Sequence, residues 1–284
     1  MVLALLLAVP SIKLAILANH DPSAWVGLCA GSGAPACNLG LYEEAIAQAA
    51  LMGSDMIHFP EAYGLQQINE AFEPFVSDAG SRPCVVAAPT AVQQRSIACA
   101  AAKYNISVAA NVFVAFANGT RRIMEIALDR AGAVVAAYSK HHLVPVAETL
   151  YAEPGPFAPT TFELEGLRWG AIICYEGVYP SIFGDWSQMD ALKQQGAELF
   201  LWAIGGMVAD QRSAPSLARK YSLPVVAAED EHGAVFVNST GNPFNSTSVL
   251  LRMANYTAHA SIAVADILVL KRDVVSGLPP APRR

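Results

Sequence analysis

The sequence predicts a single α/β domain in which sheets of buried strands are covered by helices. Apolar residues make up 54% of the 284 residues and charged residues only 15%, which excludes a disordered chain and favours a large core. Apolar runs such as 134–138 and 199–204 have the length of buried strands. Strand and helix patterns mix throughout, without a repeat or a Gly/Ser-rich linker, so we expect one domain over residues 12–275.

Strand patterns dominate the first half of the chain. We expect strands at 12–18, 56–60, 107–115, 123–128 and 133–138. Apolar residues recur at helical spacing in 42–52 and in 91–105, and Gly53 ends the first of these helices. Residues 129–132 are typical of a hairpin turn, whereas 25–40 is expected to be a loop and 66–82 a loop with a short helix.

The second half begins with a long loop over 141–159 and then alternates between strands and helices. We expect strands at 160–164, 169–175, 198–203, 225–229 and 235–238, with two more between 249 and 270. Helices are expected at 190–196 and 211–221.

The two ends of the chain differ from this pattern. Residues 1–11 are rich in Leu and Ala, and we interpret them as a signal segment, although they lack a basic start. A buried first strand, or the remainder of a longer signal, is the alternative. Residues 276–284 are expected to be a disordered tail.

Charge and hydropathy exclude two classes of partner. The net charge is −6 and the pI about 5.5, whereas a nucleic-acid binder needs clustered Lys and Arg. No apolar run approaches the roughly 18 residues of a membrane span. We therefore expect a small-molecule partner rather than a nucleic acid or a bilayer.

Asn-X-Ser/Thr sequons favour a glycoprotein of the secretory pathway. Ten asparagines and 27 Ser or Thr residues in 284 predict about one sequon by chance. Five are present, beginning at Asn105, Asn118, Asn238, Asn245 and Asn255. The alternative is that several are turn-forming Asn-Gly or Asn-Ser pairs. We favour secretion with glycosylation at all five.

The chain has an odd number of cysteines. They are Cys29, Cys37, Cys84, Cys99 and Cys174. In a secreted protein this count suggests two disulfides and one free thiol, whereas in a cytosolic protein all five could be buried thiols.

Three stretches carry residues suited to covalent catalysis. Glu61, Lys140 and Cys174 each follow an apolar run, where α/β folds place their active sites. A thiol beside a cation loses its proton more easily, and a carboxylate can accept that proton and pass it to a leaving amine. Such a thiol would attack an amide or nitrile carbon to give a thioester, while the ammonium and a backbone N–H stabilise the oxyanion.

In this order the stretches 58–64, 138–148 and 170–176 resemble the three motifs of the nitrilase superfamily of carbon–nitrogen hydrolases, over about residues 12–270. The resemblance implies an α-β-β-α sandwich, commonly dimeric and without a cofactor. It makes Glu61 the general base, Lys140 the oxyanion stabiliser and Cys174 the nucleophile. It also implies a supporting role for Glu148, and the backbone N–H of Tyr175 is well placed for an oxyanion hole.

A finer resemblance concerns residues 83–84, 91–99 and 105–111, which are similar to the biotinidase and vanin (pantetheinase) branch of secreted glycoproteins. That branch implies a Cys84–Cys99 disulfide, and we then expect Cys29 to pair with Cys37 and Cys174 to stay free. Two features of this chain differ from that branch. Tyr175-Glu176 and the stretch 140–145 are more similar to apolipoprotein N-acyltransferases, and the chain is too short for the extra C-terminal domain of vanins.

Several residues near the motifs have two interpretations. Glu176 lines the substrate pocket or orients Lys140. Trp202 walls the acyl pocket or fills the core, and Tyr63 is a similar case. We list Tyr63, Glu176 and Trp202 as candidate substrate-binding residues. For His141 and His142 no third metal ligand is evident, so we expect packing roles and no metal site.

We conclude from the sequence that the chain is a secreted amidohydrolase. Water would hydrolyse the linear amide of a small acyl–amine conjugate, such as a biotinyl or pantetheine-like amide, through a Cys174 thioester. One alternative is an acyltransferase that passes the acyl group to an amine. The other is an inactive secreted binding protein with the same fold. A homodimer is expected because dimers are usual for this fold.

Overall fold

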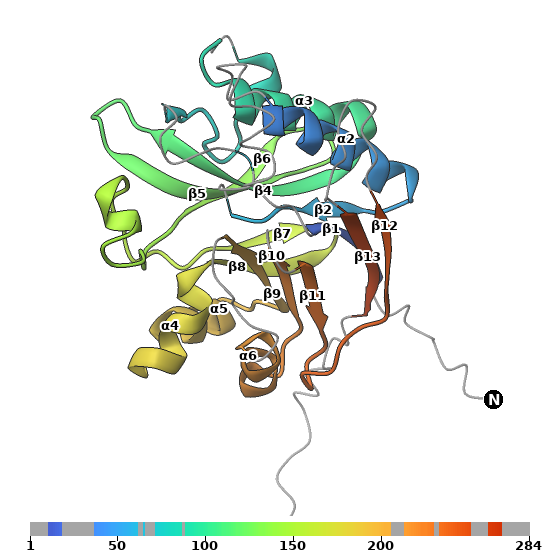
Figure 1. The fold of residues 1–284 in the computed structure, drawn as a ribbon, viewed down its shortest axis with the longest axis vertical. Coiled ribbons are helices and arrows are strands. Elements are labelled where there is room, and N and C mark those ends of the chain that lie inside the picture. Colours follow the sequence, from blue (N-terminus) through green and yellow to red (C-terminus); the bar gives the residue numbers. More distant parts are fainter. Residues whose placement is uncertain are drawn as a thin grey trace, which may run out of the picture.

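The computed structural model describes residues 11–18, 37–61, 65, 72–86, 89–205, 213–229, 233–250 and 261–268. Two β-sheets face each other, and helices cover both outer faces (Figure 1). The chain is a mixed α/β domain, as the sequence predicts, and its layers follow the α-β-β-α order that the resemblance implies.

The first sheet has the strand order β12-β13-β1-β2-β4-β5-β6, with β3 beside β4. Its strands are β1 (Ser11–Ala18), β2 (Met56–His58), β3 (Glu73–Pro74), β4 (Ser107–Ala115), β5 (Arg121–Leu128), β6 (Val134–Ser139), β12 (Ser246–Leu250) and β13 (Ser261–Leu268). β1 is parallel to β2 and antiparallel to β13. The sheet therefore places a strand from the beginning of the sequence beside a strand from near its end.

The second sheet has the strand order β11-β10-β9-β8-β7. Its strands are β7 (Thr161–Leu164), β8 (Leu167–Ile173), β9 (Leu199–Ile204), β10 (Val225–Glu229) and β11 (Gly233–Val237). β8, β9 and β10 run parallel, with Ile173 beside Ala203 at the carboxyl ends of β8 and β9. Parallel neighbours bring the residues that follow each strand to one edge.

Helices close the sandwich on both sides (Figure 1). α2 (Cys37–Leu51) and α3 (Val92–Tyr104) cover the first sheet, with Ala45, Ile46 and Ile97 fully buried. α4 (Tyr175–Phe183), α5 (Ser187–Gln194) and α6 (Ser213–Tyr221) cover the second sheet. Two short 3₁₀ turns are η2 (Pro83–Val85) and η3 (Glu148–Leu150).

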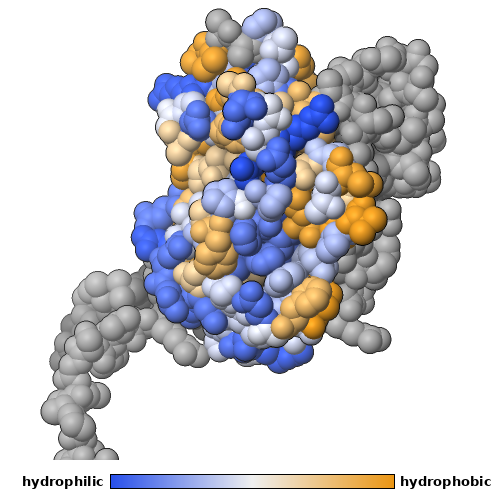
Figure 2. All heavy atoms as spheres, turned by 90° about the vertical axis from the view of Figure 1, so that its left-hand side faces the viewer, coloured by the Kyte–Doolittle hydropathy of each residue, from blue (hydrophilic) through white to orange (hydrophobic). Residues whose placement is uncertain are grey.

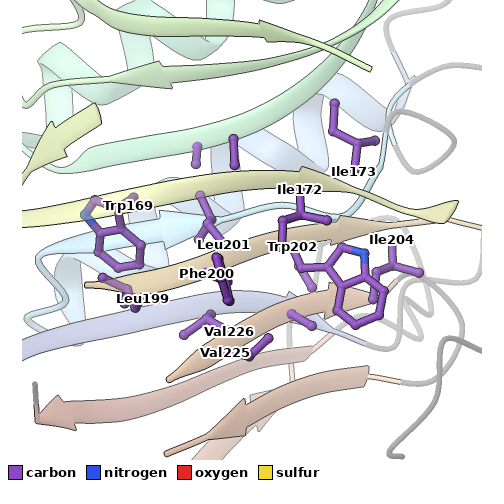
Figure 3. Close-up of a cluster of buried hydrophobic side chains, with 14 of the residues drawn as sticks. Trp169, Ile172, Ile173, Leu199, Phe200, Leu201, Trp202, Ile204, Val225 and Val226 are labelled. Carbon is purple, nitrogen blue, oxygen red and sulfur yellow. The ribbon is translucent and has the colours of Figure 1, made fainter. Parts of the chain in front are cut away.

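The core around the second sheet is built from the apolar runs of β8, β9 and β10. Figure 3 shows Trp169 and Trp202 at opposite ends of this cluster, with Phe200 and Leu201 between them. All four side chains are at most 1% exposed. Fully burying a large apolar side chain contributes roughly 1.5–3 kcal/mol, so these strands form a rigid support for whatever follows their carboxyl ends.

The main difference from the predicted elements lies after Cys174. The strand expected over 169–175 ends at Ile173, and Tyr175 begins α4, which the sequence did not predict. Gly177 and Pro180 read as helix breakers in the sequence, yet both are buried within this helix. α2 also begins at Cys37 rather than at 42, and α5 at Ser187 rather than at 190.

Several predictions fall outside the described residues. These are the signal segment over 1–11, of which only Ser11 is described, as the first residue of β1, and the tail 276–284, Tyr63, Asn255 and the Cys29–Cys37 pairing. The Cys84–Cys99 disulfide is present and joins η2 to α3. Across the part of the chain that the structure describes, we find no helix long and apolar enough to cross a membrane.

Candidate active site

A lysine with two carboxylates forms the centre of the candidate site. Lys140 follows β6, and its Nζ donates to Glu61 Oε1 at 2.7 Å and to Glu148 Oε1 at 2.5 Å. All three side chains are at most 2% exposed. Because an ammonium has three N–H donors, one remains for a further acceptor.

Cys174 lies at a sharp turn between β8 and α4. Its backbone has φ 44° and ψ −110°, a region that non-Gly residues rarely occupy and that concentrates at functional sites. Its N–H donates to Ala203 O at 2.6 Å, and the Trp202 indole N–H donates to Cys174 O at 2.9 Å. These bonds hold the turn in place, and the thiol itself donates to Gly205 O at 3.4 Å.

The structure brings the three motif residues together. The ligand atoms of Glu61, Glu148 and Cys174 all lie within 4.8 Å of one another. The Glu61 N–H donates to Ile204 O at 3.2 Å, which joins the segment after β2 to the end of β9. Glu61 Oε2 is buried and has no hydrogen-bond partner among the described residues, so it is free to accept a proton.

The electrostatics of Glu61 suit a general base. Burial raises its pKa to about 7, and the charge of Glu148 acts in the same direction, while Lys140 lowers it. For Lys140, burial alone would lower the pKa, but the charges of Glu61, Cys174 and Glu148 raise it above its usual value. Lys140 therefore stays an ammonium when Glu61 titrates.

The thiol differs from the sequence-based expectation. The nearby lysine was expected to make Cys174 lose its proton easily. Burial instead raises the pKa of Cys174 well above its usual value, the charge of Glu61 adds to this, and Lys140 offsets only part of it. Cys174 is thus a neutral thiol at rest and needs a base at the moment of attack.

The same group offers two carboxylates and a sulfur that could ligate a metal ion. The Lys140 ammonium, however, is bonded to one oxygen of each carboxylate. A cation is already present between them, and this donor set does not fit a second one.

Glu176 connects the lysine segment to the cysteine turn. Its Oε1 accepts from Tyr138 OH at 2.6 Å and from the N–H groups of His141 and His142 at 2.8 and 3.2 Å, and its Oε2 accepts from the Ile173 N–H at 2.9 Å. The side chain is 1% exposed. Of the two interpretations from the sequence, these contacts favour orientation of Lys140 over substrate binding.

Trp202 is fully buried behind the cysteine turn. A Cβ at Gly177 would lie 2.2 Å from its indole ring, so only glycine leaves room for this packing. The position favours the core interpretation of Trp202 over a pocket wall.

Tyr175 begins α4, and among the described residues its backbone N–H donates to no acceptor. It remains available for an oxyanion.

The two histidines pack beside the site. His141 Nδ1 lies 2.8 Å from Gly155 O, and His142 Nδ1 lies 3.2 Å from Gln188 Oε1. The His142 ring stacks on Tyr179 with centroids 4.0 Å apart. These contacts agree with packing roles.

Sequence reasoning missed two groups of supporting residues. Tyr138 and Gln188 extend the Glu176 network, because Gln188 Nε2 donates to Tyr138 OH at 2.8 Å. His58 and Glu125 form a buried pair at 3.4 Å in the first sheet. Tyr138 lies two residues before Lys140, so the strand period of two could have placed it on the same face.

The described sequons lie in different surroundings. Asn105 follows α3 in a left-handed conformation, and Asn118 lies in the turn between β4 and β5. Asn238 is half-buried, and its Oδ1 accepts from the N–H groups of Thr240 and Asn242, while Asn245 is exposed. Whether any of them carries a glycan stays a prediction.

Comparison with known proteins agrees with the fold. Residues 24–239 match the carbon–nitrogen hydrolase family. No curated protein sequence matches the chain. Among solved structures, an amidase from Nesterenkonia sp. is similar, with 18% identity, a TM-score of 0.65 and 90% of both chains covered.

Two further structures of that amidase contain small amides. One variant, with 19% identity, a TM-score of 0.67 and 90% of both chains covered, carries the acetamide moiety of fluoroacetamide on its active-site cysteine. Another, with 18% identity, a TM-score of 0.67 and 90% and 91% coverage, is in complex with butyramide. At these identities the likeness shows a shared fold.

Proposed function

Since this chain belongs to the carbon–nitrogen hydrolase family, we propose that it hydrolyses the linear amide of a small acyl–amine conjugate through a thioester on Cys174. The observation that carries the proposal is the pairing of a buried free thiol with Glu61. Burial raises the pKa of that carboxylate to about 7, its Oε2 has no hydrogen-bond partner among the described residues, and one of its oxygens lies within 4.8 Å of the sulfur.

Acylation begins with proton transfer. Glu61 accepts the proton of Cys174 as the sulfur attacks the amide carbon, and the carbonyl oxygen takes the electron pair of its π bond. The third N–H of Lys140 and the N–H of Tyr175 stabilise this oxyanion. Glu61 then donates its proton to the amide nitrogen, the C–N bond breaks, and the amine leaves.

Deacylation repeats these roles with water. Glu61 accepts a proton from the water as its oxygen attacks the thioester carbon, and Lys140 and Tyr175 again stabilise the oxyanion. The C–S bond breaks, the acid leaves, and the sulfur recovers its proton from Glu61. Glu148 keeps Lys140 in position throughout, since its Oε2 is itself held by the Val144 N–H at 2.8 Å.

The substrate is proposed to be a biotinidase- or pantetheinase-like conjugate. The stretches 83–84, 91–99 and 105–111 support this branch, and so does the Cys84–Cys99 disulfide that it implies. The butyramide and acetamide groups held by the structurally similar amidase suggest short aliphatic amides as the first comparison substrates.

We place the protein in the secretory pathway, glycosylated, and in a homodimer. The five sequons and a disulfide support the location, because disulfides persist in oxidising compartments. Ile182 and Phe183 at the end of α4 are 59% and 58% exposed, and a dimer would cover these apolar side chains. Light scattering of the purified chain would measure the oligomeric state.

A panel of amides tests the proposal. Biotinyl, pantothenyl and short aliphatic amides are incubated with the enzyme, and the released amine is quantified, with Cys174→Ala as the control. We expect turnover that the control lacks. Turnover by Cys174→Ala near the wild-type rate would overturn the nucleophile assignment, and no turnover of any amide would favour the inactive binding protein.

Acyl transfer is the second candidate, because Tyr175-Glu176 and the stretch 140–145 are similar to N-acyltransferases. The same reactions with an added amine distinguish the two. Hydrolysis gives the free acid at all amine concentrations, whereas a transferase gives mainly the new amide.

A further inference from the structure

A pocket of about 410 Å³ lies on the outer face of the first sheet. β6 contributes Ala137 and Ser139 to its lining, and these residues alternate with Tyr138 and Lys140. Because successive side chains of a strand point to opposite faces of the sheet, the pocket and the catalytic lysine lie on opposite sides. The proposed amide chemistry therefore does not use this pocket.

Two aromatic rings line the pocket together with polar groups. Phe75 and Phe116 are both half-buried, and their ring centroids lie 4.9 Å apart at 40°. Asp78 and Arg122 line the same space, and Ser139 Oγ has no hydrogen-bond partner among the described residues. Aromatic faces with a few polar groups suit a ligand that has both C–H and hydroxyl surfaces. A sugar ring has both.

The turn between β4 and β5 places a sequon on this pocket. Asn118 is exposed and lines the pocket, two residues after Phe116. The Phe116 N–H donates to Thr120 O at 2.8 Å, the Gly119 N–H donates to Phe116 O at 2.9 Å, and Gly119 has φ 87°. Asn118 Oδ1 accepts from the Thr120 N–H at 3.0 Å. Within the described residues its Nδ2, where an N-glycan would attach, makes no hydrogen bond.

We propose that this pocket holds the first sugar residues of an N-glycan carried by Asn118, with a sugar ring against Phe116 and Phe75. The C–H groups on one face of the ring meet the electron-rich aromatic face, and Arg122 and Asp78 bind hydroxyl or amide groups. The volume is at the lower end of the roughly 300–1,000 Å³ typical of small-molecule sites, so the outer branches of the glycan extend into solvent.

The attachment uses a lipid-diphosphate-linked oligosaccharide, the donor of the secretory pathway, so the inference rests on the proposed location. Nδ2 forms a bond to the anomeric carbon and loses one proton, and the lipid diphosphate leaves.

Figure 2 looks at the side of the molecule where the β4–β5 hairpin extends in Figure 1. Hydrophilic and hydrophobic residues are mixed over that face.

Other described sequons lack this arrangement. Ser107 of the Asn105 sequon is buried in β4 and donates to Glu165. Asn238 also has a phenylalanine two residues earlier, but Phe236 is only 4% exposed and lies in the core. Asn245 is exposed and provides the matched control.

The test is a double-mutant cycle on the full chain, secreted from eukaryotic cells. It compares wild type, Asn118→Gln, Phe116→Leu and the double variant, with Asn245→Gln as the control. Phe116→Leu keeps an apolar side chain but removes the aromatic face. Glycopeptide mass spectrometry gives the occupancy of each sequon, and thermal unfolding gives Tm before and after trimming to one N-acetylglucosamine.

We expect Asn118→Gln to lower Tm by about 2–4 °C in the wild-type background and by much less in the Phe116→Leu background. Trimming to one sugar retains the stabilisation, and Asn245→Gln leaves Tm unchanged. An equal loss in both backgrounds, or no loss in the wild type, would overturn the inference. If no sequon is occupied, the inference and the secretory location fail together, whereas amide hydrolysis by the same preparations is judged separately.

Discussion

Replacing Glu148 by glutamine changes the charge around the proposed base without removing a catalytic group. Glu148 raises the pKa of Glu61, which burial already raises to about 7. Glu61 must be unprotonated to accept the thiol proton, so activity is lost as the pH falls through its pKa. Glu148→Gln removes the neighbouring negative charge and therefore lowers the pKa of Glu61.

The size of this change follows from the geometry. The ligand atoms of Glu61 and Glu148 lie within 4.8 Å of each other. At an effective dielectric constant of about 20, two such charges interact by ~3.5 kcal/mol, or ~2.5 pKa units. The Lys140 ammonium between them offsets part of this. We expect the acidic limb of the pH profile to move down by at least about one unit.

The maximal rate falls at the same time. Lys140 loses one of its two charged partners, and misplacement of this proposed oxyanion stabiliser by about 1 Å can lower the rate by about 100-fold. The assay is kcat/KM for an amide between about pH 5 and 9. Glu153→Gln, which removes a negative charge from an exposed position in the same loop, is the control. If the acidic limb of the pH profile of Glu148→Gln stays in place or moves to higher pH, the reasoning is refuted.

The remaining predictions concern the support of the site. Glu176→Gln removes the negative charge that accepts from four donors. We expect denaturation to show a loss of ~2–3 kcal/mol in the free energy of unfolding, and kinetics to show a lower kcat with little change in KM. An unchanged kcat would contradict the positioning role. Gly177→Ala places a Cβ against Trp202 and should lower the free energy of unfolding by ~1–3 kcal/mol or more. The alkylation rate of Cys174 should fall as well. Wild-type values for both quantities would contradict this prediction. Removing the disulfide with Cys84→Ala and Cys99→Ala should lower the free energy of unfolding by ~3 kcal/mol, because the bond closes a loop between residues with a sequence separation of 15. The value of kcat should not change, since the disulfide lies far from Cys174 in sequence. A loss of kcat without a loss of stability would contradict this prediction.

The sequence predicts the fold and the centre of the site because both depend on local patterns. Buried strands appear as apolar runs, and Glu61, Lys140 and Cys174 each follow such a run. Since α/β folds place active-site residues at the carboxyl ends of strands, we expect these residues to come together although they are far apart in sequence. They do so from non-neighbouring strands, because β4 and β5 lie between β2 and β6, and β8 belongs to the second sheet. The observed contact between Lys140 and Glu61 confirms this expectation.

Features that depend on tertiary packing could not be predicted. α4 contains Gly177 and Pro180, which normally indicate a break, and the need for glycine arises only from the indole of Trp202. Three of the four donors to Glu176 come from residues 138–142, which no spacing rule connects to it. The pKa of Cys174 was misjudged because burial, which the sequence does not reveal, outweighs the charge of Lys140.

The central claim is that Glu61 activates Cys174 for attack on an amide carbon. Intact-protein mass spectrometry of the enzyme quenched during turnover of an amide measures the acyl-enzyme directly, with peptide mapping to locate it. We expect one acyl group on Cys174 in the wild type and none in Glu61→Gln or Cys174→Ala. An acyl group on another residue, or undiminished acylation of Glu61→Gln, would contradict the account.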